Sequence, residues 1–296
     1  LYGKSKKPKF GRLSEAENLE YDIETGDSQI DLIIFDLQDV GARFYTYIST
    51  LHYVMEACAE QNIPMLLLDR PNPNGHYIDG PILEPKHKSF VGMHPVPVIH
   101  GMTIGEYAQM INGEGWLANG IKCELTVIPI KNYNHQTSYN LPIKPSPNLP
   151  NAKAINLYPS LCFFEGTNVS VGRGTDKQFQ IYGSPFLPEG KFSFTPQPNL
   201  GARNPKHKNK VCHGFDLSEH EDLNALNLNW LIEFYTANQQ YAPKETYFNN
   251  FFTKLAGTKK LQYQIEAGLS EAEIKASWQI GLTAFSKIRE QYLLYK

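Results

Sequence analysis

The sequence turns from apolar to polar within Leu32-Ile33-Ile34-Phe35-Asp36-Leu37-Gln38-Asp39-Val40-Gly41-Ala42-Arg43-Phe44-Tyr45-Thr46-Tyr47. Its apolar start is too continuous for a strand with one wet face and is typical of a parallel strand covered on both faces. In open α/β sheets, ligands bind beyond the carboxyl ends of such strands. The stretch therefore predicts an α/β fold with a loop of functional residues. The first candidates are Asp36, Gln38, Asp39, Arg43, Tyr45 and Tyr47.

A second apolar run repeats the pattern. Residues 46–61 carry apolar side chains at helical spacing, with Thr46 as a suitable N-cap. Residues 63–68 predict a second buried strand, which ends in Asp69-Arg70-Pro71-Asn72-Pro73-Asn74-Gly75. A strand, a helix and a strand in this order form a right-handed βαβ unit, which brings both polar strand ends to one edge of the sheet. We therefore expect Asp36 and Asp69 to be neighbours.

The remaining sequence predicts two domains. A helix at 103–112 and a strand at 125–130 extend a Rossmann-like parallel layer, which we assign to residues 1–144. The prolines of residues 141–150 favour extended backbone and mark a seam. Residues 145–296 then predict a smaller α+β domain, with a cleft between the two. Its last helix starts with Ser270 and Glu273 in capping-box spacing and carries one apolar face, which predicts core packing.

The composition indicates a globular protein, and no motif of the sequence predicts a bound cofactor. The chain has 296 residues, of which 41% are hydrophobic, and a net charge of −2. This balance argues against a nucleic-acid surface, and the basic clusters at 4–9 and 206–210 are interpreted as solvated loops. No run approaches the roughly 20 apolar residues of a membrane span. The spacing of acids, histidines and glycines predicts no metal site and no nucleotide site.

The cysteines do not suggest a disulfide framework. They are widely scattered and never form a Cys-x-x-Cys pair, so a zinc site is not expected either. We expect small buried hydrophobes instead. The residues are Cys58, Cys123, Cys162 and Cys212.

Glu165 is the most interesting acid of the second half. It follows Leu161-Cys162-Phe163-Phe164, which predicts an apolar strand, and precedes a glycine-rich turn. Partial burial would raise the pKa of its carboxyl group, as a general acid needs. Alternatively, Glu165 accepts hydrogen bonds from loop amides or pairs with Arg173. The segment 172–175 predicts either an anion-binding nest or a plain tight turn.

Arg43 and Arg70 allow two interpretations. A planar guanidinium suits a substrate carboxylate. Arginines at strand ends also pair with nearby acids, and Asp39 and Asp69 are available. The ion pair is favoured for Arg70, whereas both interpretations stay open for Arg43.

Aromatic and polar side chains add further candidates. Tyr45 suits stacking on a sugar ring, whereas Tyr47 also fits the apolar stripe of its helix. His100 lies in a strand-to-helix turn, from which it can donate to a ligand. Glu106 forms a capping box with Thr103, so we do not expect it to be catalytic.

Six separated segments, in order along the chain, closely resemble the NamZ/YbbC family of exo-acting β-N-acetylmuramidases. The resemblance implies hydrolysis of a terminal, non-reducing N-acetylmuramic acid from peptidoglycan fragments, in a cleft and without metal or nucleotide. It also implies export to the periplasm or the cell surface. The segments are residues 35–51, 68–73, 100–106, 145–150, 164–168 and 172–175.

The resemblance also implies roles for residues. Family members carry about a hundred further residues before the point where this chain starts, including a Pro-Glu-His-Gly segment whose glutamate resembles the leading acid/base, and we expect this segment to be missing here. Glycoside hydrolysis needs two carboxyl groups. The catalytic candidates of this chain are Glu165, Asp36 and Asp69. The substrate-binding candidates are Gln38, Arg43, Tyr45, Arg70, Asn72, His100, Asn168 and Arg173, with Arg43 or Arg173 on the lactyl carboxylate.

Two other functions remain open from the sequence. The first is a carbohydrate-binding protein that keeps the cleft and lacks catalysis. The second is an α/β enzyme that acts on a phosphorylated small molecule through residues 172–175. The absence of a lysine-bearing phosphate loop counts against the second.

Overall fold

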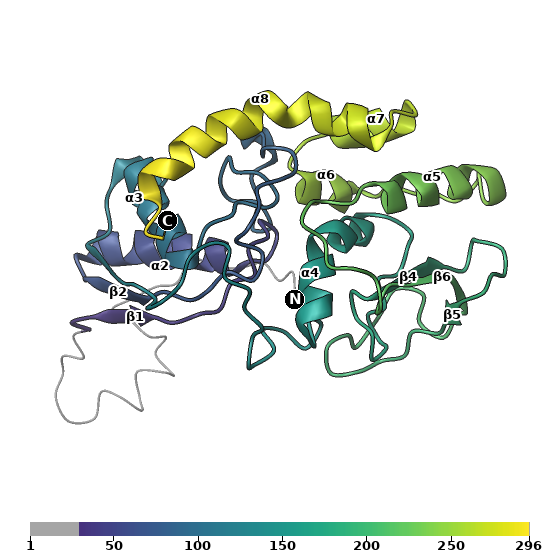
Figure 1. The fold of residues 1–296 in the computed structure, drawn as a ribbon, viewed down its shortest axis with the longest axis horizontal. Coiled ribbons are helices and arrows are strands. Elements are labelled where there is room, and N and C mark those ends of the chain that lie inside the picture. Colours follow the sequence, from purple (N-terminus) through teal and green to yellow (C-terminus); the bar gives the residue numbers. More distant parts are fainter. Residues whose placement is uncertain (1–29, 296) are drawn as a thin grey trace, which may run out of the picture.

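The computed structural model describes residues 30–295, which form two sheets with helices packed around them (Figure 1). The first sheet is parallel, with strand order β1-β2-β3. Its strands are β1 (Ile33–Phe35), β2 (Met65–Leu68) and β3 (Leu125–Ile128). Helix α2 (Tyr47–Gln61) connects β1 to β2, and α3 (Ile104–Gly113) precedes β3. The α/β class predicted from the apolar runs is therefore confirmed.

The strands of this sheet are not buried on both faces within residues 30–295. Phe35, Met65 and Leu67 pack against α2 and α3, whereas Ile34 is 59% exposed and Ile128 is 45% exposed. Short 3-10 turns complete this region, η1 (Pro85–His87) and η2 (Ala118–Gly120). The run is continuous in apolar residues, but the described helices cover only one face of it.

The second sheet is antiparallel, with order β4-β6-β5, and belongs to an α+β arrangement. Its strands are β4 (Ile181–Ser184), β5 (Ser193–Phe194) and β6 (Cys212–Asp216). The surrounding helices are α4 (Ala152–Leu161), η3 (Cys162–Gly166), α5 (Asn229–Tyr241), α6 (Asn250–Ala256), α7 (Lys260–Glu266), α8 (Glu271–Arg289) and η4 (Glu290–Tyr292).

The predicted strand before Glu165 is wrong. Those residues finish α4 and form the 3-10 turn η3. Asn151 caps α4 by accepting a hydrogen bond from the Ala154 amide at 2.9 Å. Pro159 lies inside this helix and cannot donate to the Ile155 carbonyl. The Asn74 side chain donates to that carbonyl at 3.2 Å, so the loop after β2 supplies the bond that the proline removes.

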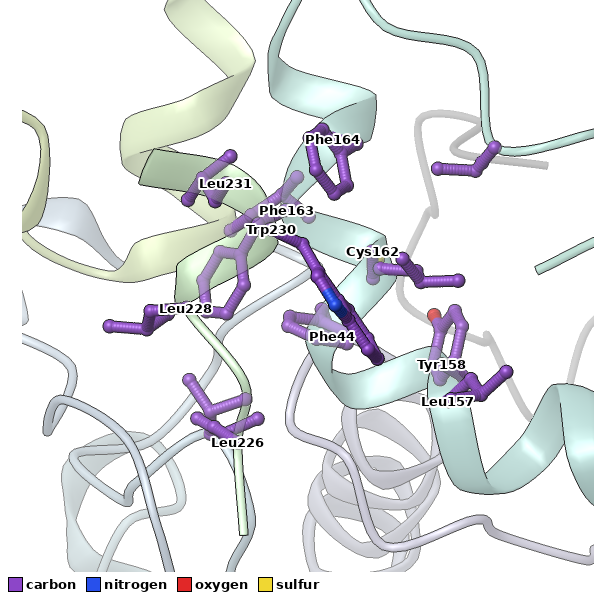
Figure 2. Packing of buried hydrophobic residues seen from close by; sticks show 14 of the residues in the cluster. Phe44, Leu157, Tyr158, Cys162, Phe163, Phe164, Leu226, Leu228, Trp230 and Leu231 are labelled. Carbon is purple, nitrogen blue, oxygen red and sulfur yellow. The ribbon is translucent and has the colours of Figure 1, made fainter. Parts of the chain in front are cut away.

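The loop after β1 contributes to the larger hydrophobic core, which lies mainly in the second half of the chain. Phe44 packs edge-on against Tyr158 and Phe163, with ring centroids 5.3 and 5.8 Å apart (Figure 2). Val40 and Ala42 belong to the same cluster. This insertion ties the parallel sheet to α4 and so fixes where the loop's polar side chains lie.

Helix α8 also links the two halves, as its path across the molecule shows (Figure 1). Ile274 and Trp278 belong to the larger core, whereas Phe285 belongs to the core beneath the parallel sheet. The predicted capping box is present, because Ser270 and Glu273 bond each other's backbone amides. The apolar face predicted for this helix is therefore confirmed as core.

The described cysteines agree with the sequence prediction. Within residues 30–295 each has a free, buried thiol. The residues are Cys58, Cys123, Cys162 and Cys212.

Candidate functional site

Asp36 and Arg70 meet at the carboxyl ends of β1 and β2. Arg70 Nε lies 2.5 Å from Asp36 Oδ1, and both side chains are 41% exposed. This hydrogen bond raises the pKa of Arg70. The ion pair favoured for Arg70 is therefore present, with Asp36 as the partner instead of Asp39 or Asp69. Gln38 lies beside them and donates to the carbonyls of Asp39 and Pro71.

The Asp69 carboxylate is saturated by hydrogen bonds. Oδ1 accepts from the Gly105 and Arg70 amides at 2.8 and 2.9 Å. Oδ2 accepts from Thr103 Oγ1 at 2.7 Å and from the Tyr295 hydroxyl at 2.6 Å. Burial raises the pKa of Asp69, which these bonds oppose. Asp69 thus holds the start of α3 and the end of the chain, which leaves it poorly placed for catalysis.

Arg43 is fully buried and has a structural set of partners. Its guanidinium donates to the carbonyls of Pro81 and Val96 at 2.8 and 2.6 Å. It also donates to the carbonyls of Leu255 and Ala256, at 3.0 and 2.8 Å, in the last turn of α6. Burial lowers the pKa of Arg43 to about 9. Its guanidinium therefore joins two segments of the fold and has no exposed face for a substrate carboxylate.

Asp39 and His100 form a buried pair beside this arginine. Asp39 Oδ2 accepts from the Gly41 amide at 2.7 Å and lies 3.7 Å from His100 Nε2. Burial raises the pKa of Asp39 to about 7 and lowers that of His100 to about 3. The Met102 amide donates to His100 Nδ1, so the neutral ring carries its proton on Nε2. His100 is 0% exposed, and a ligand cannot reach it in this structure.

Two predicted asparagines are likewise engaged within the protein. Asn72 donates to the Met102 carbonyl and accepts from the Asn74 amide, each at 2.8 Å. A Cβ on Gly41, whose φ is +77°, would lie 2.2 Å from the Asn72 side chain, so only glycine fits this turn. Asn168 donates to Asn238 Oδ1 at 2.7 Å. Both amides shape loops within the protein.

Two adjoining pockets share part of their lining, and the loop after β1 lines the larger of them. The larger has a volume of about 740 Å³ and the smaller about 330 Å³, and Arg173 and Arg203 line both. The larger pocket is rich in aromatic rings, whereas the smaller holds a carboxylate and an ammonium group. The rings belong to Phe44, Tyr45, Tyr47, Tyr158 and Phe179. The charged groups are those of Glu165 and Lys206. We call these two pockets together the paired groove.

Glu165 and Arg173 form an ion pair in this groove. Arg173 Nε lies 2.5 Å from Oε1, and its terminal nitrogen donates to Oε2 at 3.2 Å. The guanidinium also lies over the Phe179 ring, 5.5 Å from its centroid. The Thr175 amide donates to the Gly172 carbonyl at 3.1 Å, which is the tight turn considered for this segment. The turn presents Arg173 to Glu165.

Tyr45, a predicted substrate-binding residue, also lines the paired groove. Its hydroxyl donates to the Pro145 carbonyl at 2.7 Å, and its ring packs edge-on against Tyr47 at 5.0 Å between centroids. Burial raises the pKa of Tyr45. Among the predicted site residues, the groove thus collects Tyr45, Glu165 and Arg173. Asp36, Gln38 and Arg70 lie at the strand ends.

The sequence missed the basic side of the groove. Lys206, interpreted as part of a solvated cluster, donates to the carbonyls of Thr167, Val169 and Phe164 at 2.5, 2.9 and 3.0 Å. Burial lowers the pKa of this lysine to about 8. Arg203 carries no motif that distinguishes it from other loop arginines. The one available signal of an ordered loop was Pro205, which lies between Arg203 and the basic cluster 206–210.

Sequence comparison places both halves of the chain in one family. Residues 1–153 match the sequence profile described as exo-β-N-acetylmuramidase NamZ, N-terminal, and residues 156–295 match the corresponding C-terminal profile. The chain belongs to the NamZ exo-β-N-acetylmuramidase family. The peptidoglycan β-N-acetylmuramidase NamZ of Bacillus subtilis is 39% identical over an alignment that covers all of this chain and 71% of the relative.

Solved structures agree with the NamZ assignment. A DUF1343 family protein from Bacteroides fragilis superposes with a TM-score of 0.87 at 49% identity, covering 96% of this chain and 78% of that one. A second DUF1343 protein from the same organism has a TM-score of 0.76 at 23% identity, covering 92% and 76%, and supports the fold alone.

Two negative findings apply to residues 30–295 of this NamZ-family chain. No helix there is long and apolar enough to cross a membrane. Within the same residues, no group of at least three His, Cys, Asp or Glu side chains is arranged to hold a metal ion.

Proposed function

We propose that this protein is a glycosidase that releases N-acetylmuramic acid from the non-reducing ends of peptidoglycan fragments. The observation that carries the proposal is the whole-chain likeness to the B. subtilis β-N-acetylmuramidase, at 39% identity, with both NamZ profiles matched in order. The proposed substrates are muramyl saccharides derived from peptidoglycan. Because that polymer lies outside the cytoplasm, we propose an exported, periplasmic or cell-surface location.

The paired groove is the proposed sugar-binding cleft. Its volume suits a small saccharide, and tyrosine rings that line it offer flat apolar faces for a pyranose. Residues 44–47 line it from one side of the seam near residue 145, and Arg173 and Arg203 from the other. This supports the predicted division into a Rossmann-like domain at 1–144 and a smaller domain at 145–296.

Glu165 is the proposed catalytic carboxylate of the groove. Cleavage passes through a sugar with oxocarbenium character, which a nearby carboxylate stabilises or attacks. Glu165 is held in the groove by its contacts with Arg173, and we propose this stabilising or attacking role for it. The resemblance predicts the Pro-Glu-His-Gly glutamate as the proton donor.

Turnover of a chromogenic N-acetylmuraminide tests the proposal. The complete protein, with the Pro-Glu-His-Gly segment present, should release the chromophore and free N-acetylmuramic acid, identified by mass spectrometry, and should not act on the N-acetylglucosaminide. Glu165→Gln should lower kcat by at least about 100-fold. Glu189→Gln, an exposed acid of another loop, is the matched control with an unchanged rate. Binding without turnover by the wild type would indicate a carbohydrate-binding protein instead.

A further inference from the structure

Within residues 30–295, Arg203 is the groove cation whose charge stays available for a ligand. It lines both pockets and is exposed. Arg173, the other arginine shared by the pockets, is engaged by Glu165. The ammonium group of Lys206 donates to four carbonyls. For Arg203, residues 30–295 provide neither an ion pair nor a hydrogen-bond partner for the guanidinium.

The loop that carries Arg203 is fixed on both sides of it. Asn148 Nδ2 donates to the Gly201 carbonyl at 2.8 Å. The Ala202 amide donates to Asn199 Oδ1 at 2.8 Å, and the two residues also exchange backbone hydrogen bonds. On the other side of Arg203, Lys206 anchors the loop through its hydrogen bonds to the carbonyls of Phe164, Thr167 and Val169. The backbone at Arg203 is therefore ordered before a ligand arrives, which lowers the entropy cost of binding through this side chain.

The groove places this cation in a chemically selective setting. The two amino sugars of peptidoglycan differ at one position, where N-acetylmuramic acid carries a lactyl ether with a carboxylate and N-acetylglucosamine carries a hydroxyl group. The Glu165 carboxylate repels a second carboxylate, so the acid of the sugar needs its own counter-charge. A guanidinium binds a carboxylate with two parallel hydrogen bonds, which a hydroxyl group cannot match.

We propose that Arg203 binds the lactyl carboxylate of the sugar in the paired groove and thereby selects muramic acid over glucosamine. The proposal rests on the function proposed above. It assigns the carboxylate to Arg203 in place of Arg43, which is buried, and of Arg173, which holds Glu165.

Calorimetric titration with free N-acetylmuramic acid, its lactyl amide and N-acetylglucosamine tests this assignment in the intact protein. Arg203→Gln should weaken binding of the acid by about 10-fold or more and leave binding of the amide within about 2-fold. Arg203→Lys keeps the positive charge and loses the paired donors of the guanidinium. Its affinity for the acid should lie between those of the wild type and Arg203→Gln. Lys208→Gln, which removes one positive charge from the same exposed loop, is the control and should bind all three sugars like the wild type.

The chromogenic assay adds a kinetic readout. Arg203→Gln should raise KM for the muraminide more than it lowers kcat, because the carboxylate lies away from the bond that breaks. Equal losses for acid and amide, no loss for the acid, or a wild type that does not prefer the acid would each overturn the role of Arg203. A wild type that prefers the acid in titration but cleaves no muraminide would refute the proposed function and leave the binding result to decide on Arg203.

Discussion

Two polar stretches of this molecule look alike in sequence and lie in different environments. Both carry an acid, glycine and an arginine, in 36–47 after β1 and in 165–175 after α4. In the first, Arg43 is 0% exposed and bonds four carbonyls. In the second, Arg173 lines the paired groove and bonds Glu165. The comparison teaches that neighbouring apolar side chains decide which arginine meets solvent.

Phe44 accounts for the burial of Arg43. This ring enters the larger core against Tyr158 and Phe163 and takes the preceding arginine into the interior with it. Arg173 instead lies between Gly172 and Gly174, whose positive φ angles of 74° and 83° fold the backbone into an open turn. A buried guanidinium with four acceptors stabilises the fold, whereas one beside a pocket lies close to any ligand that enters it.

The largest expected effect is on stability, from Arg43→Met. The variant removes the guanidinium hydrogen bonds to four buried carbonyls, and each lost bond costs about 1 kcal/mol or more. The free energy of unfolding should fall by at least about 4 kcal/mol, measured by urea denaturation. Arg203→Met, which removes an exposed arginine, should change it by less than about 0.5 kcal/mol. If Arg43→Met kept its stability and lost only affinity for the muraminide, Arg43 would be a substrate ligand.

The elements that the sequence predicted correctly followed from local signals that do not depend on distant residues. Apolar runs predicted β1, β2 and β3, and hydroxyl-to-acid spacing predicted the capping boxes of α3 and α8. The strand predicted before Glu165 was wrong because four apolar residues suit a short strand as well as the end of a helix. The Asn151 cap and the hydrogen bond from Asn74 to the Ile155 carbonyl favour the helix. Asn74 and Ile155 are 81 residues apart in the sequence.

The site was harder to predict than the fold for the same reason. The sequence suggested Tyr45, Glu165 and Arg173, which line the paired groove, because each stands beside a visible break in the sequence pattern. The long-range contacts that bury Arg43 leave no mark near it, since its partners lie 38 to 213 residues away. The exposure of Arg203 likewise depends on anchors at Asn148 and Lys206, which no local pattern connects.

A smaller effect, on pH dependence, is expected at Asp39 and His100 in the buried stretch. The pKa of Asp39 rises from 3.8 to about 7 in the folded protein, so between these values the folded state holds the extra proton and stability falls as pH rises. The pKa of His100 falls from 6.5 to about 3, so the unfolded state holds the extra proton and stability rises with pH. From about pH 4 to 6.5 the two contributions oppose each other.

Single variants should separate these two slopes. Compared with the wild type, Asp39→Asn should gain stability as pH rises from about 4 to 6.5, because only the histidine contribution remains. His100→Gln should lose stability over the same interval. Each slope is at most about 1.4 kcal/mol per pH unit. Denaturation midpoints at several pH values provide the measurement, and parallel curves for all three proteins would show that neither group titrates as burial implies.

The smallest effect is expected where an ion pair is open to water. Asp36 and Arg70 are each 41% exposed, whereas the side chains of Arg173 and Glu165 are 21% and 11% exposed. A double-mutant cycle of Asp36→Asn and Arg70→Gln should give a coupling energy below about 1 kcal/mol that fades in 1 M salt, since solvent and ions screen the charges. The corresponding cycle of Glu165→Gln and Arg173→Gln should give a larger coupling that salt changes less. Equal couplings would mean that the groove leaves its ion pair as hydrated as the strand ends do, and Glu165 would then lack the sheltered setting that its proposed role requires.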